Sequence, residues 1–373
     1  MKTKLIINML AAVVMFAQSA TRAAAKPALK DVFQNDFLVG AALNPAQFCE
    51  SNTAEATLVR RQFNSISPEN ALKWENVHPA PGRYDFAMAD RYVAFGESNG
   101  MFIVGHTLIW HQQTPDWVFQ DGHGQPASRA LLLERMRDHI FTVMGRYKGR
   151  VKGWDVVNEA LAEDGTLRNS PWRKIIGDDY VLKAYQWAHA ADLQAELYYN
   201  DYALENRPKQ NGALALIKRL EQEGVHITGI GLQEHDSLDW PATAQLDETI
   251  SAFANLGLHV MITELDLDVL PPAKPDRSAE VSRRVAFQAG MNPYPDSLPR
   301  AMQQKLAQRY ADLFAVFVKH RHSISRVTFW GVTDAGSWLN NWPVQGRTAY
   351  PLLFGRDCRP KPAFDEVITV ASP

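Results

Sequence analysis

This chain of 373 residues has few cysteines, no large excess of positive or negative charge, and no apolar run long enough to cross a bilayer. Its two cysteines, Cys49 and Cys358, are too few for a disulfide-rich scaffold. Lysine and arginine number 39 against 41 acidic residues, a net charge of −2, and no basic patch is interleaved with aromatic residues. Nucleic acid is therefore not an expected partner. We also find no low-complexity tract, repeat or Ser/Thr/Pro-rich linker, so we expect no appended binding module.

The first residues have the pattern of an export signal. Lys2 and Lys4 precede an apolar stretch at 5–16, and the three alanines at 23–25 offer a small-residue cleavage site. The apolar stretch is too short to span a bilayer, and no cysteine lies near the cleavage site to carry a lipid. We expect residues 1–25 to be a cleaved signal peptide. The mature protein would then be exported, secreted or periplasmic, and have no membrane partner.

Short apolar runs of strand length alternate with helical stretches along the rest of the chain. The clearest helical stretch is 301–320, where Leu306, Tyr310, Leu313, Phe314 and Phe317 form a buried stripe at the i, i+3, i+4 spacing. Eight such alternations predict an α/β fold, a (β/α)8 TIM barrel, with a single catalytic domain over residues 26–373. The predicted strands are 37–42, 63–66, 101–108, 151–157, 195–199, 227–232, 259–263 and 326–331.

The longest stretch without a regular pattern is 268–300. We expect it to be the loop after the seventh strand, on the face that carries the active site in barrel enzymes. A linker to a second domain is the alternative, although the barrel pattern continues on both sides. The residues of this stretch that break regular structure are Pro271, Pro272, Pro275, Gly290, Pro293, Pro295 and Pro299.

Two glutamates stand at the ends of predicted strands four and seven. Glu159 closes the apolar run at 151–157, and Glu264 closes the run at 259–263. A carboxylate at the end of a buried strand is costly to desolvate unless it is paired or used. We interpret Glu159 and Glu264 as a catalytic pair; a structural ion-pair role is the alternative. In a glycosidase, carboxyl groups about 5–5.5 Å apart favour hydrolysis with retention of configuration at the anomeric carbon. A separation of about 6.5–9.5 Å favours inversion of that configuration.

Six motifs at predicted strand ends resemble glycoside hydrolase family 10, the retaining endo-β-1,4-xylanases. The resemblance extends from about residue 35 to residue 368. It implies a TIM barrel that hydrolyses xylan and xylo-oligosaccharides, needs no cofactor or metal, and is a monomer. The motifs are WDVVNE at 154–159, ITELD at 262–266, PENALKW at 68–74, GHTLIWH at 105–111, QEH at 233–235 and FWGV at 329–332.

The resemblance also implies roles for single residues. Glu159 would be the general acid/base, Glu264 the nucleophile, and His235 a hydrogen-bond donor to that nucleophile. Asn158 would bind the sugar 2-hydroxyl. For Glu69, Asn70 and Lys73 the alternative is a solvated helix start. For His106 it is a histidine satisfied in the core, and for Trp330 and Trp338 it is core packing. The substrate-binding residues expected in this way are Glu69, Asn70, Lys73, His106, Trp110, Gln113, Asn158, Tyr202, Gln233, His235, Trp330 and Trp338.

Four positions near these motifs need separate comment. Many family members carry an asparagine where this chain has Ala203, so a polar contact is expected to be missing there. Glu234 and Asp236 flank His235 and would either disfavour acid-substituted xylans or simply face solvent. Asp266 follows the nucleophile by two residues and is expected either to orient neighbouring polar groups or to be purely structural.

The two cysteines fall after predicted strands one and eight, which are neighbours in a closed barrel. We therefore hypothesise a Cys49–Cys358 disulfide, with two free thiols as the alternative.

Two other functions compete with the leading one. A related barrel glycosidase could act on cellulose, mixed-linkage glucan or aryl cellobiosides. A non-catalytic glycan-binding protein on the same scaffold would be expected to have a damaged carboxylate pair, whereas both glutamates are present in full motifs.

Overall fold

The computed structural model describes residues 26–225, 227–273 and 282–371. The predicted signal peptide at 1–25 and Pro275 of the predicted loop lie outside these residues.

A closed ring of parallel strands forms the centre of the molecule. Nine strands follow the order β6-β5-β4-β3-β2-β1-β9-β8-β7, and a further pairing of β6 with β8 closes the ring. The short strand β7 lies outside this ring and pairs with the last residues of β8. The predicted (β/α)8 barrel is therefore confirmed. The strands are β1 (Leu38–Leu43), β2 (Ser65–Pro68), β3 (Phe102–Ile109), β4 (Gly153–Asn158), β5 (Glu196–Asp201), β6 (Gly229–Leu232), β7 (His235–Ser237), β8 (His259–Asp268) and β9 (Ile324–Phe329).

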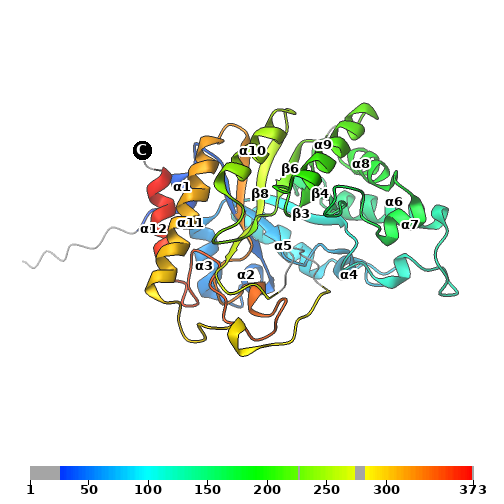
Figure 1. Cartoon of the computed structure of the whole chain (residues 1–373). Helices are drawn as coiled ribbons and strands as arrows, with labels where there is room; N and C mark the ends of the chain where they lie inside the picture. Colours follow the sequence, from blue (N-terminus) through cyan, green and yellow to red (C-terminus); the bar gives the residue numbers. More distant parts are fainter. Residues whose placement is uncertain (1–25, 226, 274–281, 372–373) are drawn as a thin grey trace, which may run out of the picture.

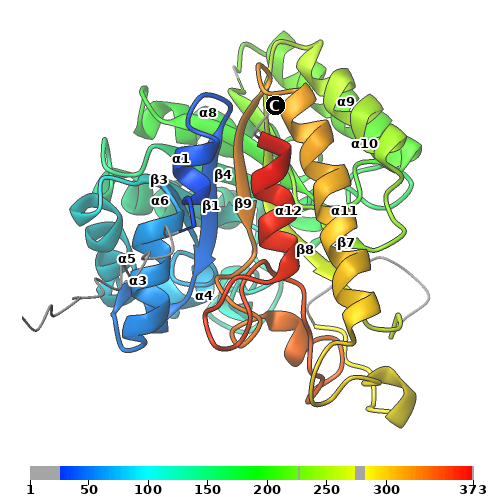
Figure 2. The ribbon, with the colours of Figure 1, turned by 90° about the vertical axis from the view of Figure 1, so that its left-hand side faces the viewer.

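Helices surround the ring, as the two ribbon views show (Figures 1 and 2). The first and last helices lie side by side, and Lys26 Nζ pairs with Asp365 Oδ1 at 2.5 Å. The described helices are α1 (Leu29–Val32), α2 (Pro45–Phe48), α3 (Thr53–Gln62), α4 (Trp74–Val77), α5 (Ala87–Ser98), η1 (Asp116–Val118), α6 (Arg129–Arg146), α7 (Pro171–Ile176), α8 (Tyr180–Ala191), α9 (Arg207–Gln222), α10 (Thr243–Ala254), η2 (Ala289–Met291), α11 (Arg300–Lys319), η3 (Trp338–Asn340) and α12 (Pro362–Ala371).

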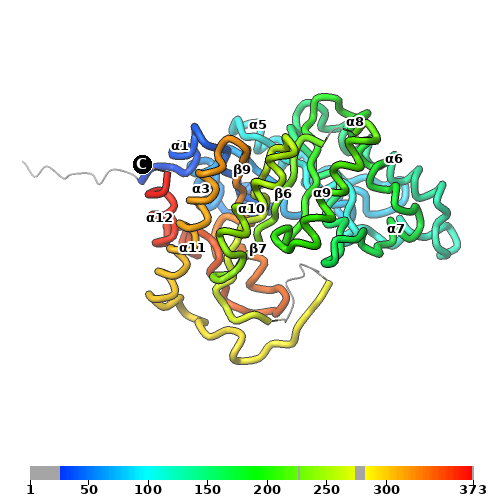
Figure 3. The backbone as a smooth tube through the Cα atoms, turned by 45° about the horizontal axis from the view of Figure 1, so that its top comes forward, coloured from blue at the N-terminus to red at the C-terminus, as the bar shows by residue number. Residues whose placement is uncertain are grey.

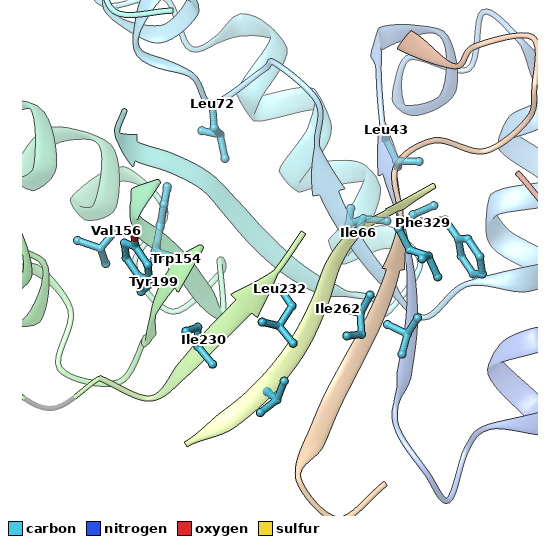
Figure 4. Packing of buried hydrophobic residues seen from close by; sticks show 14 of the residues in the cluster. Leu43, Ile66, Leu72, Trp154, Val156, Tyr199, Ile230, Leu232, Ile262 and Phe329 are labelled. Atoms are coloured by element: carbon cyan, nitrogen blue, oxygen red, sulfur yellow. The ribbon is translucent and has the colours of Figure 1, made fainter. Parts of the chain in front are cut away.

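The main hydrophobic core lies between the strands and these helices. Figure 4 shows strand residues such as Val156, Ile230 and Phe329 within it. The apolar stripe predicted for α11 is confirmed, because all five of its residues are buried in this core. Burial of this apolar surface is what fixes the helices on the ring.

The N-terminal side of the barrel interior is filled by a buried arginine. The guanidinium carbon of Arg326 lies 5.3 Å from the ring centre of Tyr198 and 5.5 Å from that of Phe102. Cation–π contacts of this kind stabilise a buried guanidinium. The interior is thus packed at this level, and a substrate is expected at the other face, where the strands end.

The segment between β8 and α11 is the predicted long loop. Among its described residues the one regular element is the short turn η2. Val285 N donates to Pro343 O at 2.9 Å, and Thr348 N donates to Asn292 Oδ1 at 2.9 Å, so this segment packs on the chain that follows β9. Figures 2 and 3 show the two segments, yellow and orange, at the same end of the molecule. The loop therefore lies on the face where β8 and β9 end.

The hypothesised Cys49–Cys358 disulfide is wrong for this structure, in which both cysteines are free thiols. Each cysteine is fixed in its own local turn. Cys49 ends α2 through a hydrogen bond from its N to Pro45 O and packs against the core. Cys358 has a positive φ of 62° in a turn closed by the bond from its N to Gly355 O. Neighbouring strands thus bring the two loops to one seam without pairing the sulfur atoms.

Candidate active site

One pocket at the carboxyl ends of the strands collects almost all of the predicted site residues. It is lined by Glu69, Asn70, Lys73, His106, Trp110, Gln113, Asn158, Glu159, Gln233, His235, Glu264, Trp330 and Trp338. These residues come from the ends of six barrel strands or the turns after them, namely β2, β3, β4, β6, β8 and β9. Closure of the ring therefore brings together residues that are far apart in the sequence.

Glu159 follows β4 directly, with a positive φ of 55°. Its carboxylate is buried and receives hydrogen bonds from uncharged groups, namely Trp110 Nε1 at 3.0 Å and Gln233 Nε2 at 3.1 Å. Gln112 Nε2 lies 3.5 Å from the same carboxylate, and Arg168 Nε donates to the main-chain oxygen of Glu159 at 3.1 Å. Gln112 and Arg168 are contacts that the sequence did not predict. Together these bonds hold the carboxyl group at the pocket wall.

Glu264 lies within β8 and is also buried. Asn200 Nδ2 donates to its Oε1 at 2.7 Å, and His235 Nε2 donates to its Oε2 at 3.2 Å. Burial alone would raise the pKa of Glu264, but the hydrogen bond from His235, the nearby His106 and the bond from Asn200 hold this pKa below its usual value. The Glu264 side chain is therefore a carboxylate at neutral pH.

His235 connects Glu264 to a second carboxylate. Its Nδ1 lies 3.0 Å from Asp266 Oδ1. Burial opposes a charge on the imidazole, yet Asp266 and Glu264 raise the pKa of His235 to about 10. The ring is thus an imidazolium at neutral pH and donates from both nitrogens. Trp338 Nε1 donates to Asp266 Oδ2 at 2.6 Å, so Asp266 orients two of the polar groups around it.

Asn200 is the main site residue missing from the sequence prediction. It lies in β5 with no exposed surface, and Thr263 Oγ1 donates to its Oδ1 at 2.6 Å. This bond fixes the amide so that Nδ2 points to Glu264 and to the Asn158 amide, 2.9 Å away. Asn200 belongs to none of the six motifs, and it comes directly after the predicted strand at 195–199. The sequence therefore offered no separate reason to select it.

The other side of the pocket is built around a buried lysine. Lys73 Nζ donates to Gln113 Oε1 at 2.7 Å and to Asn70 Oδ1 at 3.1 Å, and lies 4.8 Å from the Trp110 ring centre. Burial lowers the pKa of Lys73, although Glu264 and Glu69 oppose this shift. Burial also raises the pKa of Glu69 to about 7, against the opposing effect of Lys73. This group offers donors and acceptors for several hydroxyls.

Aromatic rings complete the pocket. The rings of Trp330 and His106 meet edge to face at 5.5 Å, and His106 Nδ1 lies 2.9 Å from Asp155 Oδ2. Trp338 lies 4.8 Å from the His235 ring and stacks on Trp342 at 4.4 Å. Flat apolar surfaces beside polar groups suit the two faces of a sugar ring.

Tyr202 is the one predicted substrate-binding residue that does not line this pocket. Its hydroxyl accepts a bond from Arg168 Nη2 at 2.9 Å and donates to Glu163 Oε1 at 2.7 Å. Its ring lies 3.3 Å from Lys209 Nζ and contacts Ala203. Tyr202 thus lies beside the acid-bearing end of β4, and its role in binding stays a prediction.

The two acids that flank His235 do not line the catalytic pocket and are not solvent-exposed. Glu234 and Asp236 are buried with Glu205, and burial together with their mutual proximity raises the pKa of both Glu234 and Asp236. Arg309 Nη2 lies 3.9 Å from Asp236. Of the two alternatives left open for Glu234 and Asp236, exposure to solvent is therefore wrong. Within the described residues, no group of three or more His, Cys, Asp or Glu side chains could hold a metal ion.

Two buried carboxyl groups at the carboxyl end of a barrel, one ionised by a cationic partner and one held by uncharged donors, define a glycoside hydrolase site. The model of glycosyl hydrolase family 10 matches residues 28–370, and the chain belongs to this family.

Individual relatives agree with this assignment. The endo-1,4-beta-xylanase A of Xylanibacter ruminicola is 42% identical over 343 residues, covering 92% of this chain and 93% of that protein. The beta-1,4-xylanase of Dictyoglomus thermophilum is 40% identical over 344 residues, covering 92% of this chain and 90% of that protein. Among solved structures, a GH10 endoxylanase from a sugarcane soil metagenome superposes with a TM-score of 0.88 at 44% identity, covering 91% of this chain and 99% of that one.

Proposed function

We propose that this protein is an endo-β-1,4-xylanase that cleaves xylan with retention, with Glu264 as nucleophile and Glu159 as acid/base. The observation that carries the proposal is the difference between the two carboxyl environments. Glu264 has a cationic donor, His235, and an amide donor, Asn200, which favour its charged form. Glu159 has uncharged side-chain donors, which suit a group that gives and takes a proton.

In the first step, a carboxylate oxygen of Glu264 attacks the anomeric carbon. The glycosidic C–O bond breaks as Glu159 gives its proton to the leaving oxygen, and a glycosyl ester forms on Glu264. In the second step, Glu159 takes a proton from water, whose oxygen attacks the same carbon and releases Glu264. Asn158, next to Glu159 in the pocket, would bind the 2-hydroxyl of the sugar, where hydrogen bonds strengthen in the transition state.

The remaining pocket residues favour xylose over glucose. Lys73 and Gln113 are hydrogen-bonded to each other, and Trp338 lines the same small pocket. Glucose carries a hydroxymethyl group at C5 that xylose lacks, and these side chains crowd the space that it would need. Aryl cellobiosides and cellulose are therefore expected to be poorer substrates.

Two measurements test this function. Reducing-sugar release should be much faster from xylan than from carboxymethylcellulose, and a clear preference for cellulose would reverse the substrate assignment. Proton NMR of the first product should show the β-anomer, because two displacements preserve configuration. An α-anomer formed first would refute the retaining mechanism, and an inert protein would favour a glycan-binding role.

Single-residue variants separate the two roles. Glu159→Ala should lose activity on xylan, and azide should partly restore turnover of an aryl xyloside while giving a β-azide product. Glu264→Ala should give no β-azide, because its nucleophile is missing. Equal behaviour of the two variants would contradict the assigned roles.

We also propose that the protein is exported as a monomer, secreted or periplasmic, after cleavage behind Ala25. The charged start, apolar stretch and small-residue site of the sequence support this proposal. In the described part of the chain, no helix combines the length and apolar character needed to cross a bilayer. Mass spectrometry of the protein from culture fractions should find an N-terminus at Lys26, and size exclusion should give the mass of one chain.

A further inference from the structure

A second, larger cavity adjoins the catalytic pocket at the ends of β7 and β8. Its volume is about 680 Å³, and it shares His235 and Trp338 with the catalytic pocket. These two side chains are in ring contact at 4.8 Å and form the partition between the spaces. We call this space the side cavity. Because the partition residues touch both spaces, a group carried by a sugar near Trp338 can extend into the side cavity.

Most of the wall of the side cavity is apolar. It includes Leu238, Val269, Leu270, Met302, Leu339 and Trp342. Val269, Leu270 and Leu339 are almost fully buried, and Trp342 is stacked on Trp338. A wall of this kind suits the C–H face of a sugar ring and does not suit a strongly hydrated group.

The charges of the side cavity disfavour an anion. Four carboxylic acids, Asp236, Asp239, Asp266 and Asp268, line it, together with His235, Lys305 and Arg347. Two of the cations are already paired: His235 with Asp266, and Arg347 with both oxygens of Asp268 at 3.1 and 3.2 Å. Asp239 stands exposed at the rim. Burial raises the pKa of Asp236, so this acid is not counted as a charge, and Lys305 is exposed. An entering carboxylate would find both buried cations already paired and would lose its hydration against the apolar wall, a cost that a neutral group does not meet.

The side cavity also contains a buried donor without a partner. The side chain of Arg347 is 1% exposed, and its Nε has no hydrogen-bond acceptor among the described residues. Buried donors in native structures are nearly always satisfied. A hydroxyl or ring oxygen of a neutral ligand would supply the missing acceptor without adding a charge.

We propose that the side cavity receives a neutral sugar branch of xylan, such as an arabinofuranosyl group, and discriminates against a uronic acid branch. The inference rests on the proposed xylanase function. The residues of the side cavity would determine which substituted xylans are preferred, whereas the catalytic pocket cleaves the unbranched chain.

The test compares three substrates: linear xylan, a neutral arabinoxylan and a glucuronoxylan. Met302→Trp fills the side cavity from the first turn of α11, and Met88→Trp makes the same change at an exposed site on α5 as the control. For Met302→Trp we expect kcat/KM on arabinoxylan relative to linear xylan to fall about tenfold, since steric loss of one bound group has effects of this order. The rate on linear xylan should stay unchanged, and Met88→Trp should change neither value.

A second variant tests the charge argument without filling the side cavity. Asp239→Lys, at the exposed rim, should raise kcat/KM on glucuronoxylan relative to linear xylan and leave the arabinoxylan ratio unchanged. The proposal is overturned if Met302→Trp leaves the arabinoxylan ratio unchanged, or if it lowers the glucuronoxylan ratio equally. If Met302→Trp does not fold, an unchanged glucuronoxylan ratio for Asp239→Lys overturns it. Failure of the unmodified protein on linear xylan would instead overturn the proposed function.

Discussion

Replacing Asn200 by alanine removes one of the two hydrogen bonds that keep Glu264 ionised. The bond from Asn200 Nδ2 to Glu264 Oε1 is 2.7 Å long and fully buried. A hydrogen bond to a charged group contributes about 1.5–3 kcal/mol, and a pKa shift of one unit corresponds to about 1.4 kcal/mol. The Asn200→Ala variant should therefore raise the pKa of Glu264, because the charged form loses this stabilisation.

The sign of the effect on activity follows from the role of Glu264. The nucleophile must be ionised, so activity is lost as the pH falls through its pKa. A higher pKa of Glu264 moves this acidic limb to higher pH. At a pH on the limb, a loss of about 1.5–3 kcal/mol corresponds to a fall in kcat/KM of about tenfold or more. The measurement is kcat/KM on a soluble xylo-oligosaccharide between pH 3 and pH 9, with circular dichroism at each pH to establish that the variant is folded.

A neighbouring variant provides the control. Thr263→Val removes the hydroxyl that orients the Asn200 amide but retains the amide donor itself. Its acidic limb should move in the same direction by less than that of Asn200→Ala. If Asn200→Ala lowers kcat/KM equally at every pH while its acidic limb coincides with that of the unmodified protein, Asn200 does not control the charge of Glu264 and the argument fails.

Three further predictions address other parts of the molecule. Asp266→Asn should lower the pKa of His235 from about 10, so that the alkaline limb of the pH–activity profile moves to lower pH; an unmoved limb would show that Asp266 does not hold the charge on His235. Burial lowers the pKa of His78 to about 4 and lowers the pKa of His139 well below 6.5; the Nδ1 atoms of the two rings lie 3.4 Å apart. Between pH 6.5 and pH 4 the unfolded chain therefore binds more protons than the folded protein. The free energy of unfolding should accordingly fall as the pH falls from 6.5 to 4. Urea unfolding at pH 6.5 and pH 4.5 should show a smaller loss of stability for His139→Phe than for the unmodified protein. An equal loss of stability in the two proteins would contradict this prediction. Finally, thiol titration in denaturant without reductant should count two free thiols, and a count of zero would restore the disulfide.

The barrel could be predicted from the sequence because each strand is an apolar run set between helical stripes. The predicted strand at 259–263 begins where β8 begins, and the predicted helical stretch at 301–320 agrees with α11 to within one residue at each end. The strand β7 was missed, since three residues that include His235 and Asp236 have no apolar pattern. It forms because the last residues of β8 extend past the ring and offer a free edge.

The site was predicted where a residue belongs to a recognisable motif at a strand end, as for Glu159, Glu264 and Lys73. Contacts made by the side chains of other strands could not be predicted in this way. The Asn200–Glu264 bond depends on how β6 pairs with both β5 and β8 and brings their side chains together, which local sequence does not encode. The burial of Glu234 and Asp236 likewise depends on Glu205 and Arg309, which are distant in sequence.

The catalytic pocket takes its residues from six strands and the turns after them. Its two glutamates lie directly after β4 and within β8, two strands that are not paired with each other. No half of the chain therefore contains a working site. A partly folded barrel, with most of its helices formed but the β6–β8 pairing still open, would lack the donors of Glu264 from Asn200 and His235. Recovery of hydrolysis during refolding should accordingly report ring closure itself, and should lag behind the recovery of helical signal.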